Sequence, residues 1–168
     1  YEIGSGLVGS EMCIRDSYVG VFQNQAVDFV EKIAKQLELF AVQLHGNEDE
    51  HYINKLHQDL EGKVQIWKAV SIDLNAENVA IDDNPQIDRF VLDSKLGNQQ
   101  GGTGKAFDWS LIPENIKAKS LLAGGISPGN IGQALQQGCL GVDLNSGVES
   151  CKGVKDFAKL TACFEKIK

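Results

Sequence analysis

The chain of 168 residues lacks several features that mark particular classes of protein. It has no apolar run of about 18 residues, and its N-terminus lacks the basic start and small-residue cleavage site of a secretory signal. Its 4 cysteines form no CxxC pair and no dense disulfide framework. With 16 basic and 23 acidic residues, the net charge is -7, which disfavours nucleic acid or an anionic membrane as a partner. We therefore expect a cytoplasmic protein with reduced thiols.

The residues that are present have the composition of one globular domain. Hydrophobic residues make up 42% and charged residues 23%, close to globular averages. Residues 1–17 differ from the rest, because they contain three glycines and no amphipathic period. Their stretch GLVGSEMCIRDS resembles the translation of a sequencing adapter. We expect residues 1–17 to be non-native, with a genuine flexible tail as the alternative, and residues 18–168 to form the domain.

Short apolar, β-branched runs alternate with helical patterns along the domain. Between the runs, apolar residues such as Ala26, Phe29 and Val30 recur at helical spacing and predict helices with one buried face. Near-continuous apolar strands that alternate with helices predict an α/β fold with a parallel sheet. This periodicity leaves open whether the sheet closes into a barrel. The predicted strands are residues 18–22, 40–44, 64–67, 89–92, 120–123 and 140–144.

Polar residues follow the ends of these predicted strands. Side chains that serve one site from the loops after many successive strands are typical of (β/α)8 barrels, whereas open sheets concentrate them near one switch point. The distribution therefore favours a TIM barrel of which six βα units are present. The residues concerned are Asn24, Gln43, His45, Lys68, Asp93, Gly124, Gly125, Asp143 and Ser146.

Three glycine-containing loops give the most specific indication of a binding site in the sequence. Paired glycines let backbone N–H groups approach an oxyanion, and the loops after the last two strands of a barrel commonly hold phosphate. Ordinary turn glycines are the alternative interpretation. The stretch Gly104-Lys105 is no Walker loop, and no GxGxxG occurs there because Phe107 follows, so this loop does not support nucleotide binding. The candidate phosphate-binding residues are Gly101, Gly102, Thr103, Gly104, Gly124, Gly125, Asn145, Ser146 and Gly147.

A series of segments resembles the phosphoribosylanthranilate isomerase family of tryptophan biosynthesis. The segments occur in order across residues 18–168, without large gaps. NSGVES and QLHGNE are most similar to the isomerase half of the bacterial enzyme that is fused to indole-3-glycerol-phosphate synthase, so such a fusion is expected. The matching segments are VGVFQNQ (19–25), VQLHGNE (42–48), IWKA (66–69), FVLDSK (90–95), GGTGKAFDW (101–109), LLAGGI (121–126), VDLNSGVES (142–150) and GVKD (153–156).

The resemblance implies an eight-stranded barrel enzyme of the aldose–ketose isomerase type. Such an enzyme converts N-(5'-phosphoribosyl)anthranilate to 1-(2-carboxyphenylamino)-1-deoxyribulose 5-phosphate by an Amadori rearrangement, without a cofactor. The family uses an aspartate after strand six as general acid, and Asp93 matches it in the FVLDSK segment. Burial among apolar neighbours is expected to raise the pKa of this carboxyl group.

The same resemblance implies that the general base of the family is missing. The family base is a cysteine in a KxCG first strand, whereas the match here begins at the third strand. We therefore expect an incomplete barrel of strands 3 to 8, which is inactive as given. Cys13 lies in the excluded segment and is not accepted as the base, and Cys139, Cys151 and Cys163 match no catalytic position.

Several other polar residues have two interpretations. His45, with Gln43, orients substrate or supports its own loop; Lys68 contacts substrate or is an interior polar residue. Asp143 holds the anthranilate amine or braces the last loop. Residues 48–50 are acidic and precede two histidines without metal-ligand spacing, so a solvated helix face and no metal site are expected.

Three functional hypotheses remain at this point. In the first, the chain is part of the isomerase and acts on a small phosphorylated substrate. In the second, it binds a sugar phosphate without catalysis. In the third, it belongs to another phosphate-binding barrel of aromatic or histidine biosynthesis, although such barrels lack GGTGKAFDW.

Overall fold

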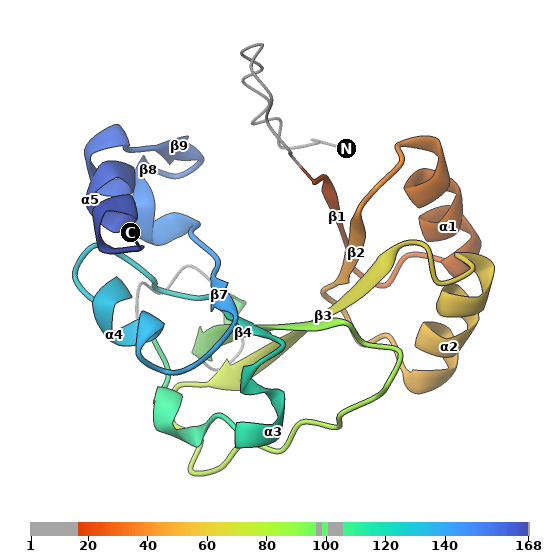
Figure 1. Cartoon of the computed structure of the whole chain (residues 1–168), viewed down its shortest axis with the longest axis horizontal. Coiled ribbons are helices and arrows are strands. Elements are labelled where there is room, and N and C mark those ends of the chain that lie inside the picture. Colours follow the sequence, from red (N-terminus) through yellow and green to blue (C-terminus); the bar gives the residue numbers. More distant parts are fainter. Residues whose placement is uncertain (1–16, 97–98, 101–105, 168) are drawn as a thin grey trace.

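The computed structural model describes residues 17–96, 99–100 and 106–167. Its main sheet contains six parallel strands in the order β1-β2-β3-β4-β6-β7. Within the described residues, β1 and β7 do not pair with each other, so the sheet forms an open arc (Figure 1). The α/β class and the six predicted strands are confirmed, but β3 is followed directly by β4, with no helix in residues 74–88. The strands are β1 Val19–Phe22, β2 Ala41–Leu44, β3 Gln65–Asp73, β4 Arg89–Leu96, β6 Ser120–Leu122 and β7 Gly141–Val142.

Helices cover the outer side of this arc (Figure 1). The residue before helix α2, Asp49, is its N-cap: its side chain accepts a hydrogen bond from the backbone N–H of Tyr52 at 2.8 Å. No helix in the described part combines the length and the apolar character needed to cross a bilayer. The helices are α1 Val27–Gln36, α2 Glu50–Asp59, α3 Glu114–Lys117, α4 Ile131–Leu135 and α5 Phe157–Ile167, with 3-10 turns at Trp109–Leu111 and Ser146–Val148.

Three short strands lie outside the predicted pattern. β5 (Gln99–Gln100) pairs antiparallel with β4. β8 (Glu149–Cys151) and β9 (Val154–Lys155) form a separate antiparallel hairpin that follows β7. These strands, with the sequences QQ, ESC and VK, contain no continuous apolar run, which is the signal that predicted the six strands of the main sheet.

Both faces of the sheet are apolar. On the outer face, side chains such as Leu44, Phe90 and Leu122 pack with the helices in one large buried cluster. On the inner face, Ala69 and Val91 belong to a second, smaller cluster. Since successive side chains of a strand point to opposite faces, burial on both faces explains why the strands are nearly continuous apolar runs.

Large exposed apolar residues are confined to the two ends of the arc. None lies between residues 41 and 134 of the described chain. The edges of β1 and β7 at these ends have no further partner strand among the described residues. The residues on the β1 side are Tyr18, Val21, Phe29, Leu37 and Phe40, and those on the β7 side are Leu135, Leu140, Val154, Phe157, Phe164 and Ile167.

We expect the isolated chain to self-associate through these two ends, because open edges and exposed apolar patches favour pairing with another chain. Replacing Val21 and Phe157, which are 62% and 84% exposed, with Lys should reduce the association. Sedimentation velocity at several concentrations measures it, and Gln58→Lys on the exposed face of α2 is the control. A monomeric wild-type chain with one cooperative thermal transition would contradict this prediction.

Candidate active site

A cavity of about 1190 Å³ lies against the inner face of the sheet and the carboxyl ends of its strands. This volume suits a small organic ligand. The inner face contributes apolar side chains, among them Val91, Leu121 and Trp67. The strand ends contribute polar groups, because the carboxyl ends of parallel strands meet at one edge. The predicted residues that line the cavity together are Gln43, His45, Asp93, Gly124, Gly125, Asp143, Asn145, Ser146 and Gly147.

Not every predicted residue is placed in this cavity. Gly101, Gly102, Thr103 and Gly104 lie outside the described residues. Lys68 does not line the cavity, whereas Cys151, on β8, does. Cys139 and Cys163 do not line it, and burial raises the pKa of both thiols.

Asp93 lies on β4 and faces the cavity, two residues after Val91. Partial burial raises the pKa of its carboxyl group, although the nearby His45 and a backbone hydrogen bond from Ser94 oppose the rise. A carboxyl group with a raised pKa retains its proton at higher pH and is therefore suited to donate it.

Asp143 follows β7 and lines the same cavity. Desolvation by the surrounding protein raises the pKa of its carboxyl group, and the charge of Asp93 raises it further. Lys155 and His45 act in the opposite direction. Two carboxyl groups that repel each other in one cavity do not ionise independently, and the charge of one favours the protonated form of the other.

Gly124 stands directly against Asp93. Its backbone has a φ of 73°, in the left-handed region that glycine adopts without strain. A Cβ atom at this position would meet the carboxylate of Asp93 and would come within 2.5 Å of the backbone nitrogen of Ser94. The turn after β6 therefore needs glycine to leave room for the carboxyl group.

Gly124→Ala is expected to lower the free energy of unfolding by about 1–3 kcal/mol, because alanine is strained in the left-handed region and would also clash with Asp93. Denaturant unfolding measures the difference. The matched control is Gly132→Ala on α4, where a Cβ atom would meet nothing within 4 Å and helix propensity favours alanine. Equal stabilities of the two variants would contradict the prediction.

The two described glycine loops pack against each other. A Cβ atom on Gly147 would overlap the backbone carbonyl of Ile126, so the loop after β7 touches the loop after β6. The side chain of Asn130 braces the loop after β6: its Nδ2 donates to the carbonyl of Gly125 at 2.9 Å, and its Oδ1 accepts from the backbone N–H of Ser127 at 2.8 Å. The loops therefore form one continuous backbone surface beside Asp93 and Asp143.

Lys68 and Glu48 form a buried ion pair, with Nζ and Oε2 2.9 Å apart and the two side chains 15% and 1% exposed. Lys68 also donates to the carbonyl of Gly46 at 2.6 Å. The carboxylate of Glu48 accepts backbone hydrogen bonds from Asn24 at 2.8 Å and Gly46 at 3.0 Å. These four residues, the loop clamp, tie together β3 and the loops after β1 and β2.

The loop clamp shows that the prediction for Glu48 was wrong and distinguishes between the two interpretations of Lys68. Glu48 was expected on a solvated helix face, but it precedes α2 and is buried. Lys68 is an interior polar residue, as one of its two interpretations held. Next to the clamp, the amide Nε2 of Gln43 and Nδ1 of His45 lie 3.2 Å apart, so His45 is supported locally while it lines the cavity.

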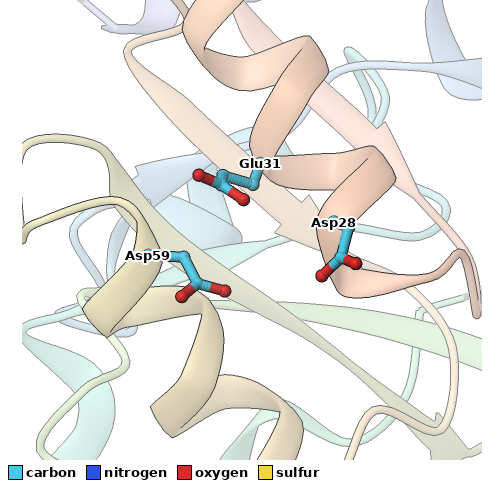
Figure 2. A group of neighbouring side chains, drawn as sticks. All are labelled: Asp28, Glu31 and Asp59. Carbon is cyan, nitrogen blue, oxygen red and sulfur yellow. The ribbon is translucent and has the colours of Figure 1, made fainter.

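One group of carboxylates lies on the opposite side of the sheet from the cavity. Asp28 and Glu31 on α1 and Asp59 on α2 gather on the outer surface (Figure 2). Glu31 is paired with Lys35 and Asp59 with Lys55, each at 2.7 Å. The cluster is thus partly neutralised by lysines and does not indicate a metal site.

Residues 11–166 match the family model of N-(5'-phosphoribosyl)anthranilate (PRA) isomerase. The chain is 59% identical over 151 residues to the tryptophan biosynthesis protein TrpCF of Haemophilus influenzae, and 51% identical over 152 residues to that of Vibrio parahaemolyticus. These matches cover 89% and 90% of this chain, and 32% and 31% of the relatives. The chain thus spans about a third of the length of the curated relatives that it matches.

Solved structures show the same similarity. The phosphoribosylanthranilate isomerase of Thermus thermophilus superposes with a TM-score of 0.71 at 29% identity, over 90% of this chain and 72% of that chain. A phosphoribosylanthranilate isomerase in complex with reduced 1-(o-carboxyphenylamino)-1-deoxyribulose 5-phosphate superposes at 0.61 with 25% identity, over 88% of this chain and 69% of that chain. The chain therefore belongs to the N-(5'-phosphoribosyl)anthranilate isomerase family.

Proposed function

We propose that this chain provides the general acid and the phosphate site of an isomerase that acts on N-(5'-phosphoribosyl)anthranilate. The observation that carries the proposal is that Asp93, Gly124 and Gly147, from three separate strand ends, line one cavity. A proton donor beside glycine loops suits a sugar phosphate whose ring must be opened.

In this proposal Asp93 donates its proton to the ring oxygen of the ribose. The C1'–O bond breaks and the anthranilate nitrogen supplies its electron pair, which gives an open-chain Schiff base. A base then removes the proton from C2', and the resulting enolamine tautomerises to the ketose. No electrons enter or leave during this Amadori rearrangement, so the chemistry needs proton donors and acceptors but no redox cofactor. The raised pKa of Asp93 supports its role as the donor.

The phosphate is proposed to bind to the backbone of Gly124, Gly125, Ser146 and Gly147. Glycine loops with no side chain in the way allow backbone N–H groups to reach an oxyanion. Gly101, Gly102, Thr103 and Gly104 are proposed to complete this site. Asn145 and Asp143 flank the second loop; Asp143 is proposed to bind the anthranilate amine, with bracing of the loop as the alternative.

We propose that the general base lies outside residues 18–168. The family resemblance places a cysteine on a first strand, and no residue of this range matches that strand. In the described chain, Cys151 is the one cysteine that lines the cavity, and it follows β7 rather than a first strand. The chain as given is therefore proposed to bind ligand without turnover and, by analogy with its TrpCF relatives, to be joined to an indole-3-glycerol-phosphate synthase domain.

Calorimetric titration with reduced 1-(o-carboxyphenylamino)-1-deoxyribulose 5-phosphate tests the proposal. We expect one binding site per chain and no turnover of the true substrate. A chimera that adds the N-terminal part of the isomerase domain of the Haemophilus influenzae relative should acquire isomerase activity. No binding of the analogue would contradict the proposal, and a chimera that binds but never turns over would support the non-catalytic alternative.

A further inference from the structure

More carboxyl groups than basic side chains line the cavity, although the proposed substrate is an anion with one phosphate and one carboxylate. Three carboxylates line it: Asp93, Asp143 and Glu149. Among the described residues that line the cavity, Lys152 is the only lysine or arginine. Like charges in one cavity repel an incoming anion, so a nearby cation has a large influence on its binding.

Lys152 belongs to a hairpin that is fixed to the second glycine loop. It lies at the turn between β8 and β9. Nζ of Lys155 donates hydrogen bonds to Oδ1 of Asn145 at 2.7 Å and to Oε1 of Glu149 at 2.9 Å. Glu149 also accepts the backbone N–H of Gly153 at 3.1 Å. The hairpin turn is therefore held beside the loop that begins at Asn145.

The other lysines near this loop are already engaged. Lys155 is paired with Glu149, and Lys159 donates to the backbone carbonyl of Glu149 at 2.6 Å. The ammonium group of Lys152, by contrast, is exposed and makes no hydrogen bond or ion pair within the described part of the chain. Together with the hydrogen bond from Lys155, its charge helps to lower the pKa of Glu149, which places it close to the carboxyl side of the cavity and leaves its N–H donors available to a ligand.

We propose that Lys152 binds the phosphate group of the substrate from the hairpin side of the cavity. This inference rests on the proposed function. The tie between Lys155 and Asn145 favours the phosphate over the carboxylate, because it fixes the hairpin to a loop with the backbone geometry of a phosphate site. A lysine acts there as a point charge that complements the neutral backbone donors.

The test compares two probes: reduced 1-(o-carboxyphenylamino)-1-deoxyribulose 5-phosphate and the same compound without its phosphate. Lys152→Ala should weaken binding of the phosphorylated probe by about tenfold, the effect of losing one charge-assisted contact, and leave the other probe unchanged. Lys152→Arg should retain most of the affinity. Lys32→Ala on the exposed face of α1, with the same change in net charge, should alter neither.

Every other result would overturn the proposed role of Lys152, and the results differ in what they imply for the proposed function. If the wild-type chain and Lys152→Ala bind the phosphorylated probe equally, Lys152 is no ligand but the proposed function stands. If Lys152→Ala loses affinity for both probes alike, the ammonium group binds the carboxylate end instead. Loss of affinity in Lys152→Arg as well would show that charge is not the cause. If the wild-type chain binds neither probe, the proposed function falls together with the role of Lys152.

Discussion

Asp93→Asn is expected to slow isomerisation by about 10²–10⁴-fold, the usual contribution of a positioned general acid. The assay uses the chimera described above, because the chain as given is proposed to lack the base. Asparagine keeps the shape of the side chain but cannot donate the proton that opens the ribose ring. Steady-state kinetics should therefore show a reduced kcat with little change in the affinity for the reduced analogue.

The control for this prediction is Asp143→Asn in the same chimera. If Asp143 braces its loop or holds the anthranilate amine, its loss should weaken binding more than it slows the chemical step. A chimera in which Asp93→Asn retains full kcat would remove Asp93 from the mechanism.

The pH dependence of the reaction follows from the direction of the pKa shift. In the proposed mechanism Asp93 acts in its protonated form, so the rate should fall as the pH rises through the pKa of this group. Burial raises that pKa and should extend activity to higher pH than an ordinary aspartate allows. The positive charge of His45 lowers the pKa of Asp93, so His45→Asn should move the falling limb of the pH–rate profile to higher pH. An unchanged or lowered limb would contradict this expectation.

Glu48→Ala is expected to lower the free energy of unfolding by about 3–5 kcal/mol, as when one partner of a buried ion pair is removed. The ammonium group of Lys68, which is only 15% exposed, would lose its counter-charge. The backbone N–H groups of Asn24 and Gly46 would lose their acceptor as well. Urea unfolding of the purified chain, followed by circular dichroism, measures the loss.

An exposed ion pair provides the matched control. Lys63 and Glu61 are 76% and 62% exposed, so Glu61→Ala should lower the free energy of unfolding far less than Glu48→Ala does. The double variant Glu48→Gln with Lys68→Met should recover part of the loss, because it leaves no unpaired charge in the interior. If Glu48→Ala is as mild as Glu61→Ala, the loop clamp does not stabilise the fold.

Acid should weaken the loop clamp. Burial by itself would raise the pKa of Glu48, but hydrogen bonds from the backbone of Asn24 and from Lys68 outweigh it, and the net shift is downward. A carboxyl group with a lowered pKa in the folded state stabilises the fold above its unfolded pKa. This contribution is lost as the pH falls through the folded value.

The sequence predicts the strands well where apolar character is continuous. All six runs correspond to strands of the sheet, since burial on both faces selects apolar residues at every position. The prediction ends β3 too early, at residue 67, because polar residues follow. The structure continues β3 to Asp73: the polar residues Ser71 and Asp73 interrupt the apolar run, but Ile72 is buried and backbone pairing such as Ser71 with Asp93 extends the ladder.

The sequence predicts the site residues only where the strand topology alone brings them together. Asp93 and His45 lie in one cavity because parallel strands bring their carboxyl ends together, which is a property of the fold class. The partnership of Glu48 with Lys68 could not be predicted, because it joins residues 20 positions apart through a loop whose conformation has no periodic signal. The placement of Lys152 depends in the same way on a hairpin too short to recognise.

Because Trp67 lies on the inner face of the sheet, its fluorescence reports on what occupies the cavity. The chain has 2 tryptophans. Trp67 lines the cavity, whereas Trp109 does not and is 8% exposed. Anthranilate compounds absorb in the near ultraviolet, where indole emits, so a bound anthranilate would accept excitation energy from the nearby Trp67. Occupancy can thus be followed by fluorescence in the unlabelled protein, and Trp67→Phe should abolish most of the signal.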